Sequence, residues 1–245
     1  METPPEIVKK ARPFFLSYFS KLGNDLNTLT AAPVVCTLQT ISLRRGREDL
    51  DALFETDRSV AHVIEDGLNT GDIHLIFDIA TSIALTGLMM MMGASVIQSQ
   101  VKTREYNEEI QEGFQEVSNQ VVGALNDLVE KKIKDGGHLL LTSTNYVPYG
   151  EFPPTLLDEV TYLCVDVQIQ VADFPPQLAS WVLSKEFAET LLGVKIPGTE
   201  VEQEQAAKKA AKAAAPPPPP PPTATATTTR GQACSSHGTS QCSRQ

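Results

Sequence analysis

A run of seven consecutive prolines, Pro216–Pro222, limits how much of this 245-residue chain can fold. Polyproline is extended and has no internal hydrogen bonds, so it cannot join a helix or a sheet. An Ala/Lys-rich stretch precedes the prolines, and a Thr/Ser-rich stretch follows them. Such residues bury too little apolar surface to offset chain entropy. We therefore expect one folded domain at residues 1–200 and a disordered tail at residues 201–245.

The charge of the chain divides at the same boundary. The chain has 20 Lys and Arg against 30 Asp and Glu, for a formal net charge of -10. The tail holds five basic and two acidic residues, a net of +3, which leaves 15 basic and 28 acidic residues, a net of -13, in the body. A nucleic-acid binder needs positive charge to contact phosphates, so the acidic body excludes that class.

The ends of the chain and its cysteines bear on where it works. Residues 1–6 lack the basic start and apolar run of a signal peptide. Two of the four cysteines lie in apolar stretches and two lie in the tail, with no Cys-x-x-Cys spacing. We therefore expect a cytoplasmic protein with no disulfide framework and no zinc knuckle.

The longest uncharged stretch, residues 79–97, raises the question of a membrane span. Its nineteen residues reach the range of roughly 17–25 that a spanning helix needs. Small and polar side chains dilute it, and the strand-like run Ile73–Phe77 precedes it. We therefore expect a strand, a turn and a core helix. In such a helix the methionines at 89–92 favour core filling over a contact surface.

Hydrophobic periodicity predicts helices that alternate with extended segments. Helices are expected at residues 7–30, 79–92, 104–134 and 176–192, with an irregularity at Pro13 and with Trp181 in the last helix. Strands are expected at residues 33–41, 60–64, 72–77, 137–144 and 162–171. This order favours an α+β domain made of two similar halves around a mainly antiparallel sheet, which packs against two long helices.

The helix expected at 104–134 carries a stripe of polar and small residues at spacings of three and four. The stripe contains Glu105, Glu109, Glu112, Glu116, Asn119, Gly123 and Asn126. Residues at these spacings share one face of a helix, so the Glu116 carboxylate and the Asn119 amide lie one turn apart. Gly123 costs the helix about 1 kcal/mol relative to Ala, but it leaves the face flat enough for another protein to approach.

The apolar helix with its Met-Met-Gly end, followed by Glu116-x-x-Asn119 and Gly123, resembles the CheC/CheX/FliY family of chemotaxis phosphatases. Glu112 stands where that family has Asp or Ser, and Pro148 follows Asn119 after 28 residues rather than 22. An insertion near residues 134–137 accounts for the longer spacing.

The first half of the chain also resembles this family. The segment Ala31–Val35 is similar to the helix end and Pro-Val strand of the flagellar switch protein FliM. Counting back from Pro33 by the family spacing reaches Lys10 and Ile7, which are no Glu/Asn pair. The resemblance therefore implies a single active helix per chain, as in CheX.

The resemblance implies a phosphatase that hydrolyses the aspartyl phosphate of a CheY-type response regulator. Asn119 would orient the attacking water, and Glu116 would pair with a lysine of the regulator. Glu112, Gly123 and Asn126 would contact the partner. A neutral amide suits the role of Asn119 because it can both donate to and accept from a water, whereas a carboxylate would repel the phosphate.

The resemblance also implies what else the chain binds. Magnesium would belong to the regulator, so this chain needs no metal or cofactor of its own, in keeping with the lack of any visible His/Cys/Asp cluster. His62 and His74 are expected to be structural. The resemblance further implies a homodimer and flagellar switch proteins as partners. The alternative is a non-catalytic module that binds a response regulator or the flagellar switch through a lapsed site.

Overall fold

The structure is a computed structural model that describes residues 3–67, 71–133, 137–158 and 160–198. The expected tail at 201–245 lies outside the described residues. The described helices are α1 (Pro5–Thr30), α2 (Gly46–Leu50), α3 (Ile79–Met89), α4 (Ala94–Thr103), α5 (Glu108–Lys132) and α6 (Lys185–Leu192), and a short 3-10 helix covers Asp51–Phe54. The strands are β1 (Val34–Arg45), β2 (Arg58–Asp66), β3 (Asp72–Asp78), β4 (His138–Val147), β5 (Thr161–Val171) and β6 (Gln177–Ser184).

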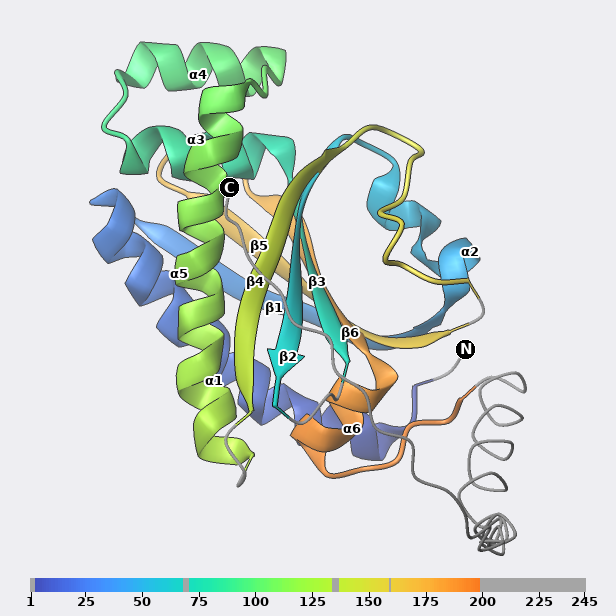
Figure 1. Cartoon of the computed structure of the whole chain (residues 1–245). Helices are drawn as coiled ribbons and strands as arrows, with labels where there is room; N and C mark the ends of the chain where they lie inside the picture. The colour runs from blue at the N-terminus through green and yellow to red at the C-terminus, as the bar shows by residue number, and fades with distance from the viewer. Residues whose placement is uncertain (1–2, 68–70, 134–136, 159, 199–245) are drawn as a thin grey trace, which may run out of the picture.

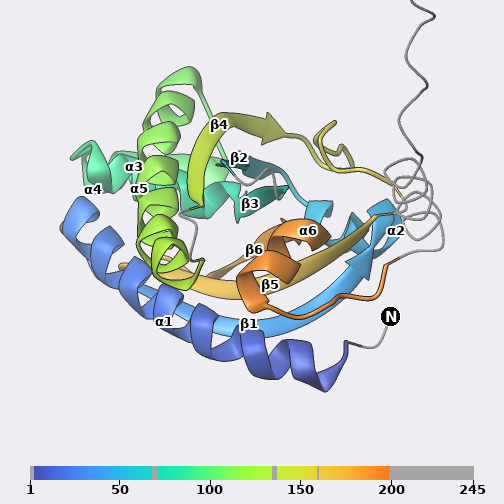
Figure 2. The same ribbon diagram turned by 60° about the horizontal axis from the view of Figure 1, so that its bottom comes forward.

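The six strands form one sheet in the order β1-β5-β6-β3-β2-β4, and every neighbouring pair is antiparallel. The two long helices α1 and α5 lie on one face of this sheet, together with α3 and α6 (Figures 1 and 2). The other face is covered by α2, the 3-10 helix and the segment after β4. The α+β prediction with two long helices is confirmed.

The two halves of the chain repeat the same succession of elements. The order α1-β1-β2-β3-α3 is followed, after α4, by α5-β4-β5-β6-α6. Exchanging each strand of the first half for its counterpart in the second half reverses the sheet order and reproduces it. The predicted internal pseudo-symmetry is therefore present in the topology, with β3 and β6 paired at the centre.

Helix α1 presents large apolar side chains to the main core at helical spacing, and it runs through Pro13 without a break. Phe15, Phe19 and Leu22 are among the fully buried ones. Tyr18 joins α1 to the second half of the domain: its hydroxyl donates to the carbonyl of Val121 in α5 at 3.2 Å and accepts from the indole of Trp181 in β6 at 3.2 Å.

The prediction of a helix at residues 176–192 is wrong for its first half and right for its second half, where α6 lies. Residues 177–184 form strand β6, in which Trp181 pairs with Val165 of β5 and Leu75 of β3. The strand is central, and most of its side chains are buried on both faces, so its sequence is a continuous apolar run. A run of this kind does not distinguish a buried strand from a buried helix by periodicity. Trp181 is in the core, as expected, but from a strand.

The helix expected at 104–134 begins four residues later than predicted. Arg104 ends α4 in a left-handed conformation, and the Asn107 side chain accepts a hydrogen bond from the backbone N–H of Ile110 at 2.9 Å, which caps α5. Glu105 therefore lies in the connection and not on the helix. The short helix α4 was not predicted, and its first four residues, 94–97, are the end of the long uncharged stretch.

The uncharged stretch from residue 79 is divided between α3 and the start of α4. Asp78 caps α3 by accepting from the backbone N–H of Ala80 at 2.8 Å, and α3 itself is buried along nearly its whole length. Within the described residues, no helix combines the length and the apolar character that crossing a membrane requires.

Candidate functional site

The exposed face of α5 carries most of the predicted stripe. Glu112, Glu116, Asn119 and Gly123 are all exposed, whereas the opposite side of the helix is buried against the sheet and α1. Their spacings of four, three and four place them along one ridge. We define these four residues as the α5 ridge.

The polar side chains of the α5 ridge are not used to hold the fold together. Within the described part of the chain, Glu112, Glu116 and Asn119 make no side-chain hydrogen bond or ion pair. No described atom lies within 4 Å of where a Cβ on Gly123 would stand. The ridge is thus an open surface with free donors and acceptors, as contact with a second molecule requires.

Asn126 departs from the stripe because it is buried. Its amide nitrogen donates to the carbonyl of Leu139 at 2.9 Å, and its amide oxygen accepts from the backbone N–H of Leu139 at 2.7 Å. These two bonds fix the start of β4 against α5. The expected place of Asn126 on the exposed stripe is therefore wrong, and the structure leaves it no free polar atom to offer a partner.

Methionines at the end of α3 lie beside the N-terminal half of α5. A Cβ on Gly113 would stand 3.0 Å from the Met90 sulfur and 3.6 Å from Met89 Cε, so the two helices touch at this glycine. Met91 follows in a left-handed turn and is 90% exposed. The expectation of core filling is right for the partly buried Met89 and wrong for Met91, which is a solvent-facing apolar side chain.

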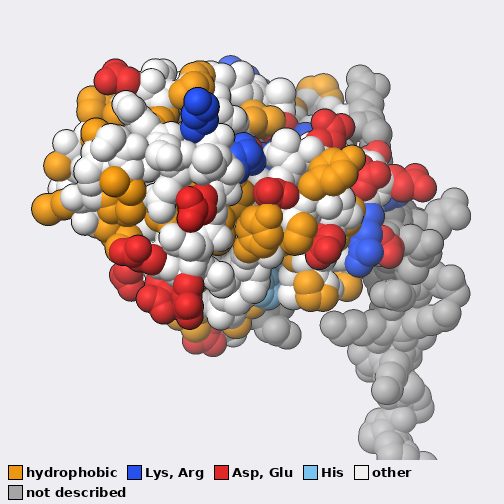
Figure 3. All heavy atoms as spheres, turned by 90° about the horizontal axis from the view of Figure 1, so that it is seen from above, with side chains coloured by type: hydrophobic (Ala, Val, Ile, Leu, Met, Phe, Trp, Pro, Cys, Tyr) orange, Lys and Arg blue, Asp and Glu red, His pale blue; other side chains and the backbone are white. Residues whose placement is uncertain are grey.

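Acidic side chains surround the start of α5. Glu105, Glu108, Glu109 and Glu112 are all exposed. The view from above, onto α3, α4 and the N-terminal end of α5, shows acidic groups gathered at one edge of that face (Figure 3). The α5 ridge therefore begins in a region of negative charge and ends at the uncharged Asn119 and Gly123.

The pseudo-symmetry identifies the residues of α1 that correspond to the α5 ridge. The side-chain oxygen of Asn27 in α1 accepts from the backbone N–H of Val34, as Asn126 accepts from that of Leu139, so equivalent residues differ by 126 − 27 = 99. The buried positions of both helices match at this offset. Glu116 and Asn119 then correspond to Ser17 and Ser20, both exposed.

This alignment corrects the positions that counting from Pro33 gave. Ser17 and Ser20 of α1, rather than Ile7 and Lys10, occupy the places of the Glu/Asn pair. Pro148 is not the counterpart of Pro33 either, because Pro33 precedes β1 whereas Pro148 follows β4. Val34 corresponds to Leu139, so His138 stands in the place of Pro33. The α5–β4 connection is longer than the α1–β1 connection, since 13 residues separate Asn126 from Leu139 against seven from Asn27 to Val34.

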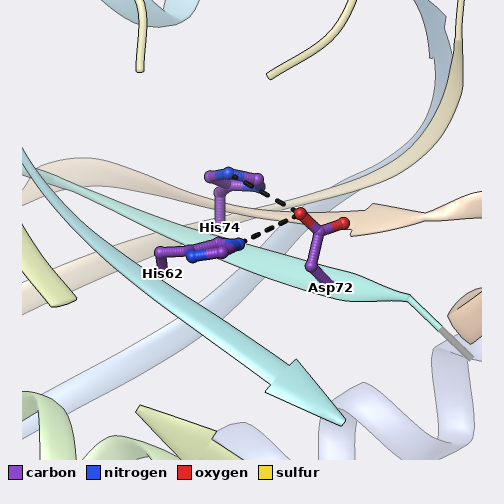
Figure 4. Close-up of side chains that lie close together, drawn as sticks. All are labelled: His62, Asp72 and His74. Atoms are coloured by element: carbon purple, nitrogen blue, oxygen red, sulfur yellow. Dashed lines mark hydrogen bonds and ion pairs between the residues drawn. The ribbon is translucent and has the colours of Figure 1, made fainter. Parts of the chain in front are cut away.

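A second polar cluster lies on the sheet face opposite α5. His62 of β2 and His74 of β3 are directly paired across the strands, and both rings lie near the carboxylate of Asp72 (Figure 4). The expectation that no His/Cys/Asp cluster exists is therefore wrong. The sequence signal was the spacing of Asp72-x-His74, and it becomes visible only when the register of β2 and β3, which pairs His74 with His62, is known.

Comparisons with protein-family models and with curated protein sequences give no match for this chain. Comparison with solved structures finds similar folds. FliY from Thermotoga maritima aligns with a TM-score of 0.66 at 17% identity, over 78% of this chain and 96% of that chain. FliM in the FliG–FliM complex from H. pylori aligns with a TM-score of 0.64 at 10% identity, over 78% and 100%. The FliM middle domain from Vibrio alginolyticus aligns with a TM-score of 0.56 at 10% identity, over 74% and 96%.

These similarities cover the described domain almost from end to end. At identities of 17% and below they concern the fold. FliY is a member of the family to which the resemblance of α5 pointed. The chain therefore has the fold of the CheC/CheX/FliY family, which it shares with the middle domain of FliM.

Proposed function

We propose that this chain is a phosphatase for the aspartyl phosphate of a CheY-type response regulator. The observation that carries the proposal is the α5 ridge, where a carboxylate and an amide stand one turn apart, exposed and without partners in the described fold. The family fold supports it, because FliY has the same architecture.

The α5 ridge would add to the regulator an amide that positions water and a carboxylate that holds the complex together. Hydrolysis of an aspartyl phosphate needs a water held in line with the phosphorus, and positioning and charge stabilisation supply most of the catalysis. Asn119 orients this water by donating and accepting hydrogen bonds. Glu116 pairs with a lysine of the regulator, and Gly123 lets the regulator approach the helix closely. Magnesium stays with the regulator.

The surroundings of the ridge fit a docking surface for a protein. Met91, just after α3, offers an exposed and flexible apolar side chain, and α3 contacts α5 at Gly113. Methionine is common on surfaces that adapt to a partner, and complementary charge increases the rate of encounter. A regulator with a basic surface around its phosphorylation site would match this arrangement.

The direct test measures the decay of autophosphorylated CheY in magnesium, with and without the full chain. We expect the chain to accelerate phosphate loss catalytically, at less than one chain per regulator. Glu116→Gln is expected to weaken the complex with the regulator, because a charge pair with lysine becomes a neutral contact. An unchanged decay rate in the presence of excess chain would rule out the phosphatase.

The second candidate is a non-catalytic module that binds a response regulator or the flagellar switch. Glu112 in place of Asp or Ser favours it, as does the similarity to FliM that was solved in complex with FliG. The two functions separate when binding is measured with a regulator that carries beryllofluoride in place of phosphate. A chain that binds this regulator but leaves phosphate decay unchanged is a binding module.

A further inference from the structure

The His62/Asp72/His74 cluster is built from one β-hairpin. His62 and His74 are partners in the β2–β3 ladder, and Asp72 precedes His74 by two residues on the same face of β3. Figure 4 shows the two imidazole rings side by side and the carboxylate turned toward both. Three chemically suitable groups therefore converge without a contribution from a flexible segment.

The distances within the cluster are close to those of a metal site. His62 Nε2 lies 3.1 Å from Asp72 Oδ2, and His74 Nε2 lies 4.0 Å from the same oxygen. One ligand atom from each residue falls within 4.8 Å of the others. A tetrahedral zinc ion with bonds of about 2.0–2.1 Å holds its ligand atoms roughly 3.3 Å apart. The His62–Asp72 pair has about this spacing, and the His74–Asp72 pair is wider by less than 1 Å.

Hydrogen bonds to Thr142 orient the His62 ring so that its Nε2 faces Asp72. The Thr142 hydroxyl donates to the backbone carbonyl of His62 at 2.9 Å, so it can only accept from the ring Nδ1–H, which is 2.8 Å away. In the neutral ring this leaves the lone pair of Nε2 directed at the Asp72 carboxylate. Two lone pairs at 3.1 Å need a cation between them, either a proton or a metal ion.

His74 supplies an imidazole that the fold has already removed from water. Its side chain is fully buried. Its Nε2 lies 2.6 Å from the Thr155 hydroxyl and 4.0 Å from Asp72 Oδ2. Its Nδ1 has no hydrogen-bond partner among the described residues. Metal ligation uses a ring nitrogen that carries no proton.

The pseudo-symmetric counterpart of this cluster differs in one decisive respect. Asp166 and Ser180 are paired across β5 and β6 next to a bulge, as His62 and His74 are across β2 and β3. The Asp166 carboxylate is saturated by an ion pair with Arg44 at 2.9 Å and by hydroxyl donors from Thr40 and Ser180, each at 2.6 Å. Among the described residues, no arginine is hydrogen-bonded to or ion-paired with His62, Asp72 or His74.

We propose that His62, Asp72 and His74 form a binding site for a divalent transition metal, with zinc as the ion that this ligand set suits best. Two imidazoles and a carboxylate are a common zinc ligand set, and three protein ligands leave one position for water or a fourth group. The partly exposed His62 and Asp72 side chains open the site to solvent, and Thr155 borders it. The site is independent of the α5 ridge, which lies on the other face of the sheet.

The test uses the full chain with the competing ligands of the tail removed. Cys234, His237 and Cys242 are replaced by Ser, Gln and Ser, because thiols and imidazole in the tail would bind zinc by themselves. Zinc stoichiometry is measured after equilibrium dialysis, zinc affinity by calorimetry, and the ligand set by the absorption spectrum with Co²⁺. We expect one zinc per chain and a cobalt spectrum without thiolate charge-transfer bands.

Two conservative variants locate the site, and a third is the matched control. Asp72→Asn and His62→Gln keep the size and polarity of partly exposed side chains, and each is expected to lower zinc affinity at least tenfold. His138→Gln, on the exposed histidine beside Glu130, is expected to leave it unchanged. Absence of zinc binding in the tail-substituted chain would overturn the proposal. So would a zinc affinity in Asp72→Asn and His62→Gln that equals that of the tail-substituted chain without these changes.

Discussion

At the scale of single residues, two asparagines on α5 differ in how the fold uses them. Asn119 is exposed and free, whereas Asn126 two turns later is buried with both ends of its amide bonded to Leu139. Their chemistry is identical and their positions in the stripe are equivalent by spacing. What separates them is that Asn126 faces Leu139 at the start of β4, whereas Asn119 faces solvent.

Replacing these two asparagines is expected to affect stability to very different extents. Asn126→Ala leaves the buried N–H and carbonyl of Leu139 unpaired, which costs about 2–4 kcal/mol of unfolding free energy. Asn119→Ala removes no contact and changes it by about 0.5 kcal/mol or less. Chemical denaturation of both variants measures the difference. Equal destabilisation by the two substitutions would show that Asn119 is structural, and would remove the basis for its role at the site.

At the scale of elements, contacts between helices explain what periodicity missed. Gly87 of α3 meets Ile97 of α4, and Gly113 of α5 meets Thr86 of α3. These glycines allow α3 to pack between its two neighbours. The α4 boundary was not predicted because Met91 and Gly93 turn the chain within a run that contains no charge, and hydropathy does not resolve a turn there.

Replacing each of two glycines of α5 by Ala is expected to change the unfolding free energy in opposite directions. In Gly113→Ala the new Cβ would stand 2.4 Å from Thr86 Cγ2, on a buried β-branched side chain with little freedom to move. We expect a loss of about 1–3 kcal/mol in unfolding free energy from overpacking, despite the better helix propensity of Ala. Gly123→Ala meets open space and is expected to stabilise the helix by up to about 1 kcal/mol.

Thermal or chemical unfolding of these two variants provides the check. A stabilised Gly113→Ala protein would mean that α3 and α5 are farther apart than the structure has them. A destabilised Gly123→Ala protein would mean that the ridge is covered by a part of the chain outside the described residues.

At the scale of the whole molecule, the pseudo-symmetry explains which features the sequence could reveal. Helix α1 buries one continuous face, and strand β5 alternates between apolar and other side chains in its sequence although most of it is buried on both faces. Their periods are therefore visible, and their predicted bounds are close. Strand β6 is buried on both faces and shows no period. The Glu116/Asn119 pair could be found because it lies within one helix, whereas the His62/Asp72/His74 cluster depends on strand register, which one sequence does not determine.

The same symmetry supplies the most direct test of the central claim that the α5 ridge, and not its α1 counterpart, dephosphorylates a response regulator. The measurement is the decay rate of autophosphorylated CheY in magnesium with the wild-type chain, Asn119→Ala and Ser20→Ala. We predict that Ser20→Ala matches the wild-type chain, while Asn119→Ala loses about a hundredfold of the acceleration because the water is no longer positioned. Acceleration that is equal for Asn119→Ala and the wild-type chain would contradict the account.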